Sequence, residues 1–223
     1  MASMEGWRAT IKSVFLQTID VILPERARAA RVRQKSITDF TLCPTPHDLH
    51  GVRITTLLNY KDTGVSDLVR ALKYEHSGHA ADICAVALTD FLREEIASMR
   101  AFSPRAILIV PMPLHKNRVR SRGFNQIEKV LARLPAEFRD GSLSRVSTKA
   151  LVRTRDTPQQ AHLSRPERLK NVAGAFAADT TDVGSTHVIL VDDVTTTGAT
   201  LAECVKTLKS AGAQVTALAL ARA

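Results

Sequence analysis

The sequence predicts an α/β fold, an open, mostly parallel, twisted sheet flanked by helices. Two short segments, 106–110 and 187–191, have an unbroken apolar centre, which is typical of strands buried on both faces. Segments with apolar residues at helical spacing lie between and after them. Because strands that alternate with helices usually pair in parallel, we expect helices on both faces of the sheet.

The composition is that of a globular chain with one main domain. The chain has 223 residues, of which 44% are hydrophobic and 24% charged, and these proportions argue against disorder. The longest uncharged run, Ser210–Ala221, is too short to span a membrane, and the N-terminus lacks a signal-peptide pattern. Three widely spaced cysteines form no disulfide framework, so we expect a cytoplasmic protein.

The first 59 residues are predicted to form a small helical and irregular extension. Residues 7–23 have apolar side chains at helical spacing, and a proline follows them. Residues 25–50 are polar and basic and contain two further prolines, which favours an irregular segment. We therefore predict an extension over 1–59 and the α/β domain over 60–223.

Elements within the α/β domain follow from the apolar pattern. Apolar stripes predict helices over 65–73, 80–96, 124–134 and 199–211, and a further helix is predicted to begin near Ser164. Strands are predicted over 106–110, 145–152, 187–191 and 215–220, of which 145–152 has the weakest pattern.

Positive charge is concentrated in three segments. The chain has 31 Lys and Arg against 22 Asp and Glu, which gives a net charge of +9. The excess lies in residues 26–35, 116–133 and 145–170. Such clusters favour a polyanionic partner, either nucleic acid or a phosphorylated metabolite. A solvated basic surface is the alternative explanation.

A candidate anion-binding loop follows the second buried strand. The segment 188–200 runs from four apolar residues into Asp192 and Asp193, then into a hydroxyl-rich loop that contains Gly198, and then into a helix. Threonine hydroxyls, close backbone amides and a helix N-terminus together suit a phosphate monoester. The two carboxylates cannot favour that phosphate, so we assign them to sugar hydroxyls or a metal. A capped turn would explain one or two of these residues but not the whole set.

This segment resembles the phosphoribosyl-pyrophosphate (PRPP) motif of type I phosphoribosyltransferases. The resemblance implies that family's fold, with Asp192 and Asp193 on the ribose hydroxyls and as catalytic residues. It further implies that the 5′-phosphate binds to the following loop, which comprises Val194, Thr195, Thr196, Thr197, Gly198, Ala199 and Thr200.

Two further basic segments follow predicted strands and are expected to face the same ligand. The first provides the pyrophosphate-side candidates, which are Pro113, Lys116, Arg118 and Arg122. The second is long and polar, as a lid over a phosphorylated substrate would be, and Arg153 and Arg155 are its catalytic candidates. For any one of these residues, an exposed arginine without function is the alternative explanation.

Five sequence blocks in order resemble the ComF family of competence proteins, which includes the GntX-type proteins. The blocks start at Pro111, Arg122, Arg153, Glu167 and Asp192, and the similarity extends from about Tyr60 to the C-terminus. The resemblance implies a role in natural transformation, with single-stranded DNA and a helicase-type partner. Family members typically begin with a four-cysteine zinc module, whereas this chain has Cys43, His47 and His50 in that region. We expect no zinc there.

Three functions remain open from the sequence. The first is a transferase that binds PRPP with Mg²⁺ and transfers the phosphoribosyl group to a nitrogenous acceptor. The second is a non-catalytic protein that binds PRPP or a nucleotide, or an adaptor associated with single-stranded DNA; the low aromatic content of 4% offers few stacking platforms for bases. The third is a nucleobase salvage phosphoribosyltransferase. The sequence predicts neither the acceptor nor the oligomeric state.

Overall fold

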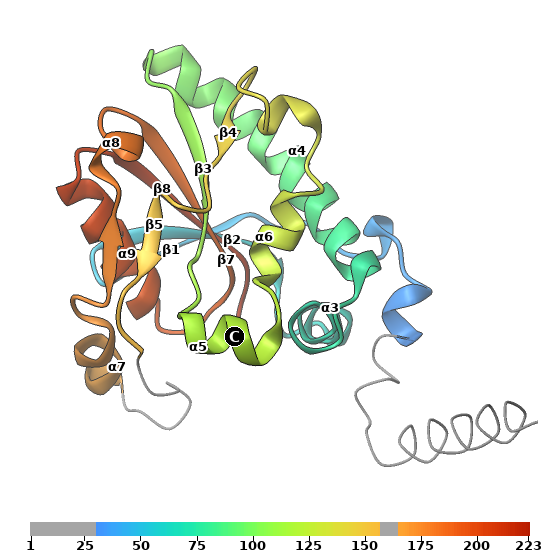
Figure 1. The fold of residues 1–223 in the computed structure, drawn as a ribbon. Helices are drawn as coiled ribbons and strands as arrows, with labels where there is room; N and C mark the ends of the chain where they lie inside the picture. The colour runs from blue at the N-terminus through green and yellow to red at the C-terminus, as the bar shows by residue number, and fades with distance from the viewer. Residues whose placement is uncertain (1–29, 157–164) are drawn as a thin grey trace, which may run out of the picture.

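A six-stranded sheet with strand order β1-β2-β8-β7-β3-β4 forms the centre of the protein. The computed structural model describes residues 30–156 and 165–223. β1 pairs with β2 in antiparallel orientation, and the other four neighbouring pairs are parallel. The predicted α/β class with a mostly parallel sheet is therefore confirmed (Figure 1).

The strands of this sheet are β1 (Thr45–Leu49), β2 (Val52–Asn59), β3 (Ile107–Pro111), β4 (Arg145–Val146), β7 (His187–Thr195) and β8 (Gln214–Arg222). A separate antiparallel ribbon pairs β5 (Leu151–Arg153) with β6 (Phe176–Ala178). The helices are α3 (Thr63–Tyr74), α4 (Gly78–Phe102), α5 (Lys116–Arg122), α6 (Gln126–Leu131), α7 (Arg165–Val172), α8 (Thr180–Val183) and α9 (Ala199–Ser210). Two short 3-10 helices span Ile37–Asp39 and Ala136–Phe138.

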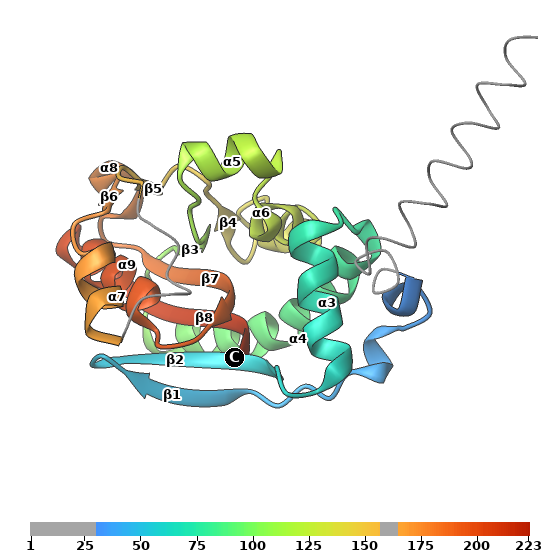
Figure 2. The same ribbon diagram turned by 90° about the horizontal axis from the view of Figure 1, so that it is seen from below.

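Helices cover both faces of the sheet (Figure 2). On one face, which we call the α4 face, side chains such as Leu68 of α3, Leu88 of α4 and Ile127 of α6 are buried in one apolar cluster. On the other, the α9 face, Leu201 and Cys204 of α9 are buried in a second cluster together with residues of β5, β6 and α7. Because successive side chains of a strand alternate between faces, β7 contributes to both clusters.

Most predicted elements of the domain are confirmed within a few residues. The strand predicted over 106–110 is β3, the one over 187–191 is the first part of β7, and the helix over 199–211 is α9. The helix predicted over 7–23 lies outside the described residues. The predicted boundary between residues 59 and 60 falls at the end of β2, so the last part of the predicted extension contributes two strands to the sheet.

Three local predictions differ from the structure. The segment predicted as irregular, 25–50, contains β1, which pairs along its whole length with β2. The strand predicted over 145–152 is two short strands in different sheets, because Ser147 accepts a hydrogen bond from the amide of Ala150 and turns the chain between them. The helix predicted over 124–134 begins at Gln126, because the Asn125 side chain caps it.

No helix in the described part of the chain is long and apolar enough to cross a membrane. The three cysteines are free thiols, Cys43 exposed and Cys84 and Cys204 buried. Cys84 lies on the α4 face and Cys204 on the α9 face, so each of the two buried thiols belongs to a different apolar cluster.

Candidate ligand site at the carboxyl edge of the sheet

The predicted phosphate loop connects the end of β7 to the first turn of α9. Thr195 is the last residue of β7, and α9 begins at Ala199. The first backbone amides of a helix have no partner within the helix, so they point out of the end of α9 together with its positive dipole end. The carboxyl edge of a parallel sheet is also where open α/β proteins bind ligands.

Gly198 allows the loop to turn tightly against the sheet. Its φ of +80° is in the left-handed region that favours glycine. A Cβ atom at this position would lie 2.8 Å from the Cβ of Leu49 and 3.0 Å from Cδ1 of Ile54. The loop therefore lies directly on β1 and β2, and a larger residue would push it away from the sheet.

The two adjacent acids lie on opposite faces of β7. Asp192 acts electrostatically on the buried thiol of Cys204 on the α9 face, and Asp193 acts on that of Cys84 on the α4 face. This arrangement follows from the alternation of side chains along a strand. At the end of the strand the two carboxyl groups are nevertheless close enough to interact through a side-chain hydrogen bond, and Lys73 acts electrostatically on both of them.

Asp193 is buried within a hydrogen-bond network on the α4 face. Its side chain is only 6% exposed. Its Oδ1 lies 3.1 Å from the Nζ of Lys73 at the end of α3, and its Oδ2 accepts a 2.5 Å hydrogen bond from the Nε2 of Gln126. The pKa of Lys73 is raised, because the carboxylates of Asp193 and Asp192 outweigh the opposing effect of burial.

Asp192 is partly buried among apolar residues and carries an unusual pKa. Burial and the neighbouring Asp193 carboxylate raise its pKa from 3.8 to about 7, although the ammonium group of Lys73 opposes the shift. Its Oδ1 accepts a hydrogen bond of 2.8 Å from the backbone amide of Asp193. A carboxylate whose pKa lies near neutrality at a sheet edge is a recognised mark of functional sites.

Arg153 lies on the α9 face near Asp192. It is 9% exposed, and its guanidinium lies 5.4 Å from the centre of the Phe176 ring. Burial and the positive charge of Arg118 lower the pKa of Arg153, whereas the negative charges of Asp156 and Asp192 act in the opposite direction. Arg153 is thus within electrostatic reach both of Asp192 and of Arg118, a candidate from the other basic segment.

The chain that follows β3 is anchored to the start of the predicted lid. Asp156 accepts a 2.7 Å hydrogen bond from Asn117 and lies 3.3 Å from Nδ1 of His115. The pKa of Asp156 is lowered, first by the hydrogen bond from Asn117. Thr157 to Ser164, the centre of the predicted lid, lie outside the described residues.

The other predicted residues have different surroundings. The guanidinium of Arg155 donates to the carbonyls of Asn171 and Ala173 at the end of α7, so it is not part of the cluster around Asp192. Pro113 is buried and Lys116 is exposed in the first turn of α5. The side chain of Arg122, the last residue of α5, lies outside the described part.

The hydroxyl groups of the phosphate loop differ in exposure. Thr195 is buried, Thr196 is exposed, and Thr197 and Thr200 are partly exposed. Val194 packs against the apolar cluster of the α4 face, and Ala199 is buried on the α9 face. The exposed and partly exposed threonines are therefore the ones that a phosphate could reach.

A polar hollow of about 440 Å³ lies on the other side of β8 from β7. It is lined by Cys43, Thr45, His47, Thr56, Leu58, Asn59, Lys61, Arg222 and Ala223. Asp192 pairs with Ala219 of β8, and Ala219 pairs with Thr56 of β2. Thr56, which lines the hollow, therefore lies in the same cross-strand row as Asp192. Arg222 bonds to Nδ1 of His47, and Nε2 of His47 lies 3.0 Å from the Thr56 hydroxyl.

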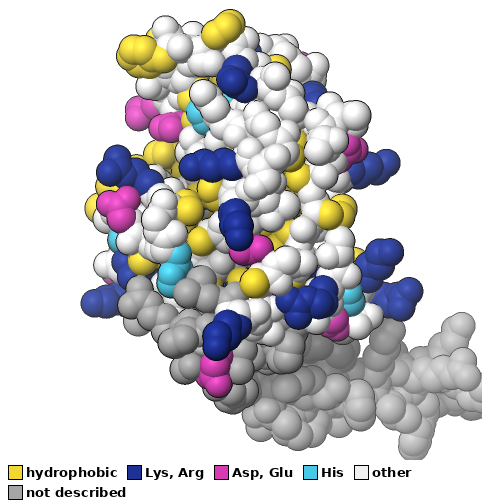
Figure 3. Space-filling model, turned by 90° about the vertical axis from the view of Figure 1, so that its left-hand side faces the viewer, with side chains coloured by type: hydrophobic (Ala, Val, Ile, Leu, Met, Phe, Trp, Pro, Cys, Tyr) yellow, Lys and Arg dark blue, Asp and Glu magenta, His cyan; other side chains and the backbone are white. Residues whose placement is uncertain are grey.

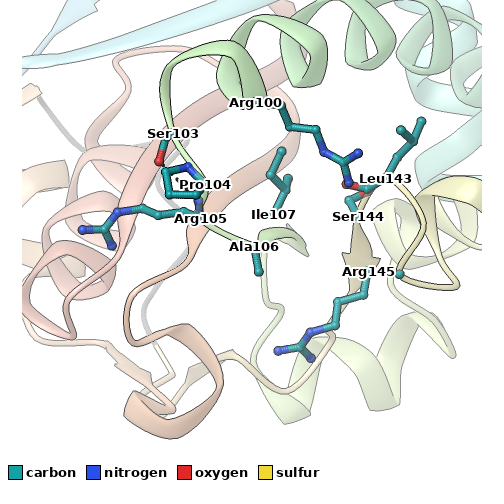
Figure 4. A pocket seen from close by; sticks show the side chains of 10 residues that line it. Arg100, Ser103, Pro104, Arg105, Ala106, Ile107, Leu143, Ser144 and Arg145 are labelled. Atoms are coloured by element: carbon teal, nitrogen blue, oxygen red, sulfur yellow. Dashed lines mark hydrogen bonds between the residues drawn. The ribbon is translucent and has the colours of Figure 1, made fainter.

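A second hollow of about 440 Å³ lies at the opposite end of the sheet (Figure 4). Its three arginines point apart, and two of them have partners: Arg100 donates to the carbonyls of residues 142 and 143, and Arg145 donates to Asp182. Its lining includes Ile107, the first residue of β3, so it is remote from Asp192. We do not include it in the candidate site.

Sequence reasoning missed the role of Lys73 and Gln126 around Asp193. Gln126 lies within one of the blocks that resemble the ComF family and Lys73 lies before all of them, and nothing in their local pattern indicates that these distant segments meet at one carboxylate. In the residues that the structure describes, no three His, Cys, Asp or Glu side chains are grouped to hold a metal ion.

Curated relatives connect the chain with competence and DNA utilization proteins. It is 31% identical over 163 residues to DNA utilization protein YhgH of Escherichia coli (strain K12), a match that covers 72% of this chain and 67% of the relative. It is 34% identical over 108 residues to Competence protein F of Haemophilus influenzae, covering 48% of this chain and 45% of that protein. The chain belongs to the ComF family.

Other comparisons of this ComF-family chain are more distant. Competence protein ComFC of Streptococcus pneumoniae is 29% identical over 124 residues, which is 56% of this chain and 49% of that protein. No family model matches the chain. Among solved structures, orotate phosphoribosyltransferase of Mycobacterium tuberculosis is similar with a TM-score of 0.36 and 10% identity, covering 87% of this chain and 95% of that one.

Proposed function

We propose that this ComF-family protein binds PRPP with Mg²⁺ at the carboxyl edge of its sheet and transfers the phosphoribosyl group to a nitrogenous acceptor. The observation that carries the proposal is the meeting of three features on the α9 face. These are the phosphate loop at the start of α9, the carboxylate of Asp192, and the guanidinium group of Arg153, which Arg118 reaches electrostatically. Together they offer partners for a phosphate, a ribose and a pyrophosphate.

The reaction separates charge in a way that this arrangement would stabilise. The bond between C1 of the ribose and the pyrophosphate oxygen breaks, and a bond between C1 and the acceptor nitrogen forms. Positive charge then develops on the sugar, beside Asp192, and negative charge develops on the leaving pyrophosphate, beside Arg153 and Arg118. The proton of the acceptor nitrogen leaves to solvent or to a nearby base.

The residues present fit a magnesium ion that arrives with the pyrophosphate. Mg²⁺ prefers oxygen ligands and is usually held by one or two carboxylates together with substrate phosphates. Asp192 and the hydroxyl of Thr196 offer such oxygens near the end of β7. When bound, the ion would neutralise charge on the leaving pyrophosphate.

The polar hollow beyond β8 is our candidate for the acceptor. A displacement at C1 requires the nucleophile and the leaving group on opposite sides of that carbon. The pyrophosphate-side candidates follow β3, on one side of β7, whereas the hollow spans β8, β2 and β1 on the other. Lys61 and Arg222 in its lining favour an acceptor that carries negative charge.

Calorimetric titration with PRPP, with and without Mg²⁺, tests the proposal. We expect Mg²⁺-dependent binding that falls at least about tenfold in Asp192→Asn, because one charge-assisted contact is lost. Arg145→Lys, at the opposite end of the sheet, is the matched control and keeps the affinity. A folded wild-type protein that does not bind PRPP would refute the proposal, and product assays with acceptor bases would follow only a positive result.

A role in DNA handling is the second candidate, favoured by the names of the relatives, which concern competence and DNA utilization. The net charge of +9 is compatible with such a partner. Lys and Arg side chains are scattered over the side of the molecule that carries α7 to α9, with acidic residues between them (Figure 3). Steeply salt-dependent binding of single-stranded DNA that PRPP does not displace would favour an adaptor over a transferase.

A further inference from the structure

We propose that the two adjacent acids have different roles: Asp193 is a positioning residue that ties α3 and α6 to the end of β7, and Asp192 is the carboxylate that faces the ligand. The role of Asp192 rests on the proposed function, because it requires PRPP as the ligand. The role of Asp193 rests only on contacts within the protein. It departs from the interpretation of the two acids as an equivalent pair on the ribose hydroxyls.

The first argument is that most of the hydrogen-bonding capacity of Asp193 is already used within the protein. An ionised carboxylate offers about four lone-pair positions. In this structure Oδ1 contacts Lys73 and accepts the backbone amide of Val194, and Oδ2 accepts from Gln126. With three internal contacts and a side chain that is only 6% exposed, Asp193 is poorly placed to bind a sugar hydroxyl as well.

The second argument is that this network joins three separate parts of the chain. Lys73 is at the end of α3, Gln126 is the first residue of α6, and Asp193 is near the end of β7. A buried charge without a partner is costly, so one carboxylate holds the two helices against the strand. This pairing joins the loop that follows β7 to the helix that follows the pyrophosphate-side segment.

The third argument concerns the segment between β3 and α6. The side chain of Asn125 donates to the carbonyl of Met112 at 3.0 Å, and the next residue, Gln126, donates to Asp193. Both ends of the segment 113–125 are therefore fixed to the sheet. Because this segment carries Arg118, the Asp193 network sets the spacing between the pyrophosphate side and the phosphate loop before any ligand binds.

A double-mutant cycle tests the pairing. Lys73→Met removes the cation that pairs with the buried Asp193 carboxylate, and Asp193→Asn removes the carboxylate in direct contact with Lys73, which then has only the charge of Asp192 nearby. Each single variant should therefore lower the midpoint of thermal unfolding. We expect the double variant to recover most of that loss, because no buried charge remains unpaired. Additive losses in the double variant would overturn the pairing, and this result is independent of whether PRPP binds.

PRPP affinity in the same cycle tests the unequal roles. If Asp193 acts through Lys73 and Gln126, the double variant recovers most of the affinity that Lys73→Met loses, whereas Asp192→Asn stays weak. A double variant that is as stable as wild type yet binds PRPP as weakly as Asp192→Asn would show that the pair contacts the ligand directly, and would overturn the positioning role. Absence of PRPP binding in the wild type would instead refute the proposed function.

A positioning role also predicts selectivity among ligands. Gln126→Leu releases the start of α6 but leaves the phosphate loop intact. We expect it to weaken PRPP binding by about tenfold or more, since small displacements of positioned groups have large effects. Binding of ribose 5-phosphate, which lacks the pyrophosphate, should change by less than about twofold. An equal loss for both ligands would indicate general destabilisation and would overturn this assignment of Gln126.

Discussion

The two ends of the parallel sheet carry similar residues but differ in what those residues contact. At the carboxyl end, β2, β3 and β7 lead into helices, so the positive ends of helix dipoles gather there. At the amino end, α4 finishes before β3, and Arg100 in its last turn donates to carbonyls of a neighbouring loop. Arg100 at the amino end therefore bonds to the protein's own backbone, whereas at the carboxyl end Arg153 lies within electrostatic reach of the Asp192 carboxylate.

This difference shows why charge clustering alone could not locate the site. The basic segment 145–170 contains Arg145, Arg153 and Arg155, which are close in sequence. In the structure Arg145 pairs with Asp182, Arg155 caps α7, and Arg153 lies in electrostatic reach of Asp192. One basic segment thus places arginines at both ends of the sheet, and only the fold determines which of them belongs to the ligand site.

Of the variants compared between the two ends of the sheet, the two glycine substitutions should differ most in their effect. Gly198→Ala introduces both a strained φ and a Cβ that lies 2.8 Å from Leu49, whereas Gly141→Ala, at φ +98°, meets no atom within 4 Å. A positive φ costs a non-glycine residue about 1–3 kcal/mol, so both variants lose stability, and Gly198→Ala loses more. Chemical denaturation measures the difference.

PRPP binding by the same two variants tests the loop directly. Gly198→Ala moves the phosphate loop off β1 and should weaken binding, whereas Gly141→Ala should not. Equal stabilities for the two variants would contradict the close packing of the loop, and equal affinities would contradict its role in phosphate binding.

Arginine substitutions should give the next largest difference. Arg153→Met keeps much of the side-chain volume over Phe176 but removes the charge, and we expect a loss of affinity for PRPP of about 1.5–3 kcal/mol, the usual value of a hydrogen bond to a charged group. Arg145→Met removes an exposed ion pair, which contributes at most about 1 kcal/mol to stability and nothing to binding. Calorimetry measures the PRPP affinity of both variants, and similar affinities would exclude Arg153 from the site.

The sequence was sufficient for the local parts of this site but not for its assembly. The strand, the acids and the loop of 188–200 are adjacent in sequence, so their order alone predicts a strand, a turn and a helix N-terminus. The network of Asp193 with Lys73 and Gln126 joins positions that lie far apart in the chain, and periodicity contains no information on such contacts. β1 was missed for a similar reason, because its pairing with β2 and not its own composition makes it a strand.

The effect of pH on PRPP binding should be smaller than the effects of the glycine and arginine substitutions, and it should depend on Asp192. In the folded protein its pKa is raised from 3.8 to about 7, so its contribution to stability is present at low pH and is lost as the pH rises through about 7. Ligand binding through the carboxylate has the opposite sign, because hydroxyl groups donate to the ionised form. PRPP affinity should therefore rise from about pH 6 to about pH 8.

The phosphate group of PRPP also ionises in this range, with a second pKa near 6, so the variant Asp192→Asn supplies the reference. It should keep the part of the pH dependence that belongs to the ligand and lose the rest. Identical pH profiles for wild type and variant would mean that the ionisation of Asp192 does not control binding.

The smallest effect is expected at Arg155, which sequence reasoning assigned to catalysis together with Arg153. Its guanidinium donates to the carbonyls of Asn171 at 3.2 Å and Ala173 at 2.8 Å, where cations stabilise a helix C-terminus by about 0.3–1 kcal/mol. Arg155→Ala should therefore lower the free energy of unfolding by about that amount and reduce PRPP affinity less than Arg153→Met. A loss of affinity equal to that of Arg153→Met would mean that Arg155 leaves α7 when the ligand binds, and that the segment moves as a lid.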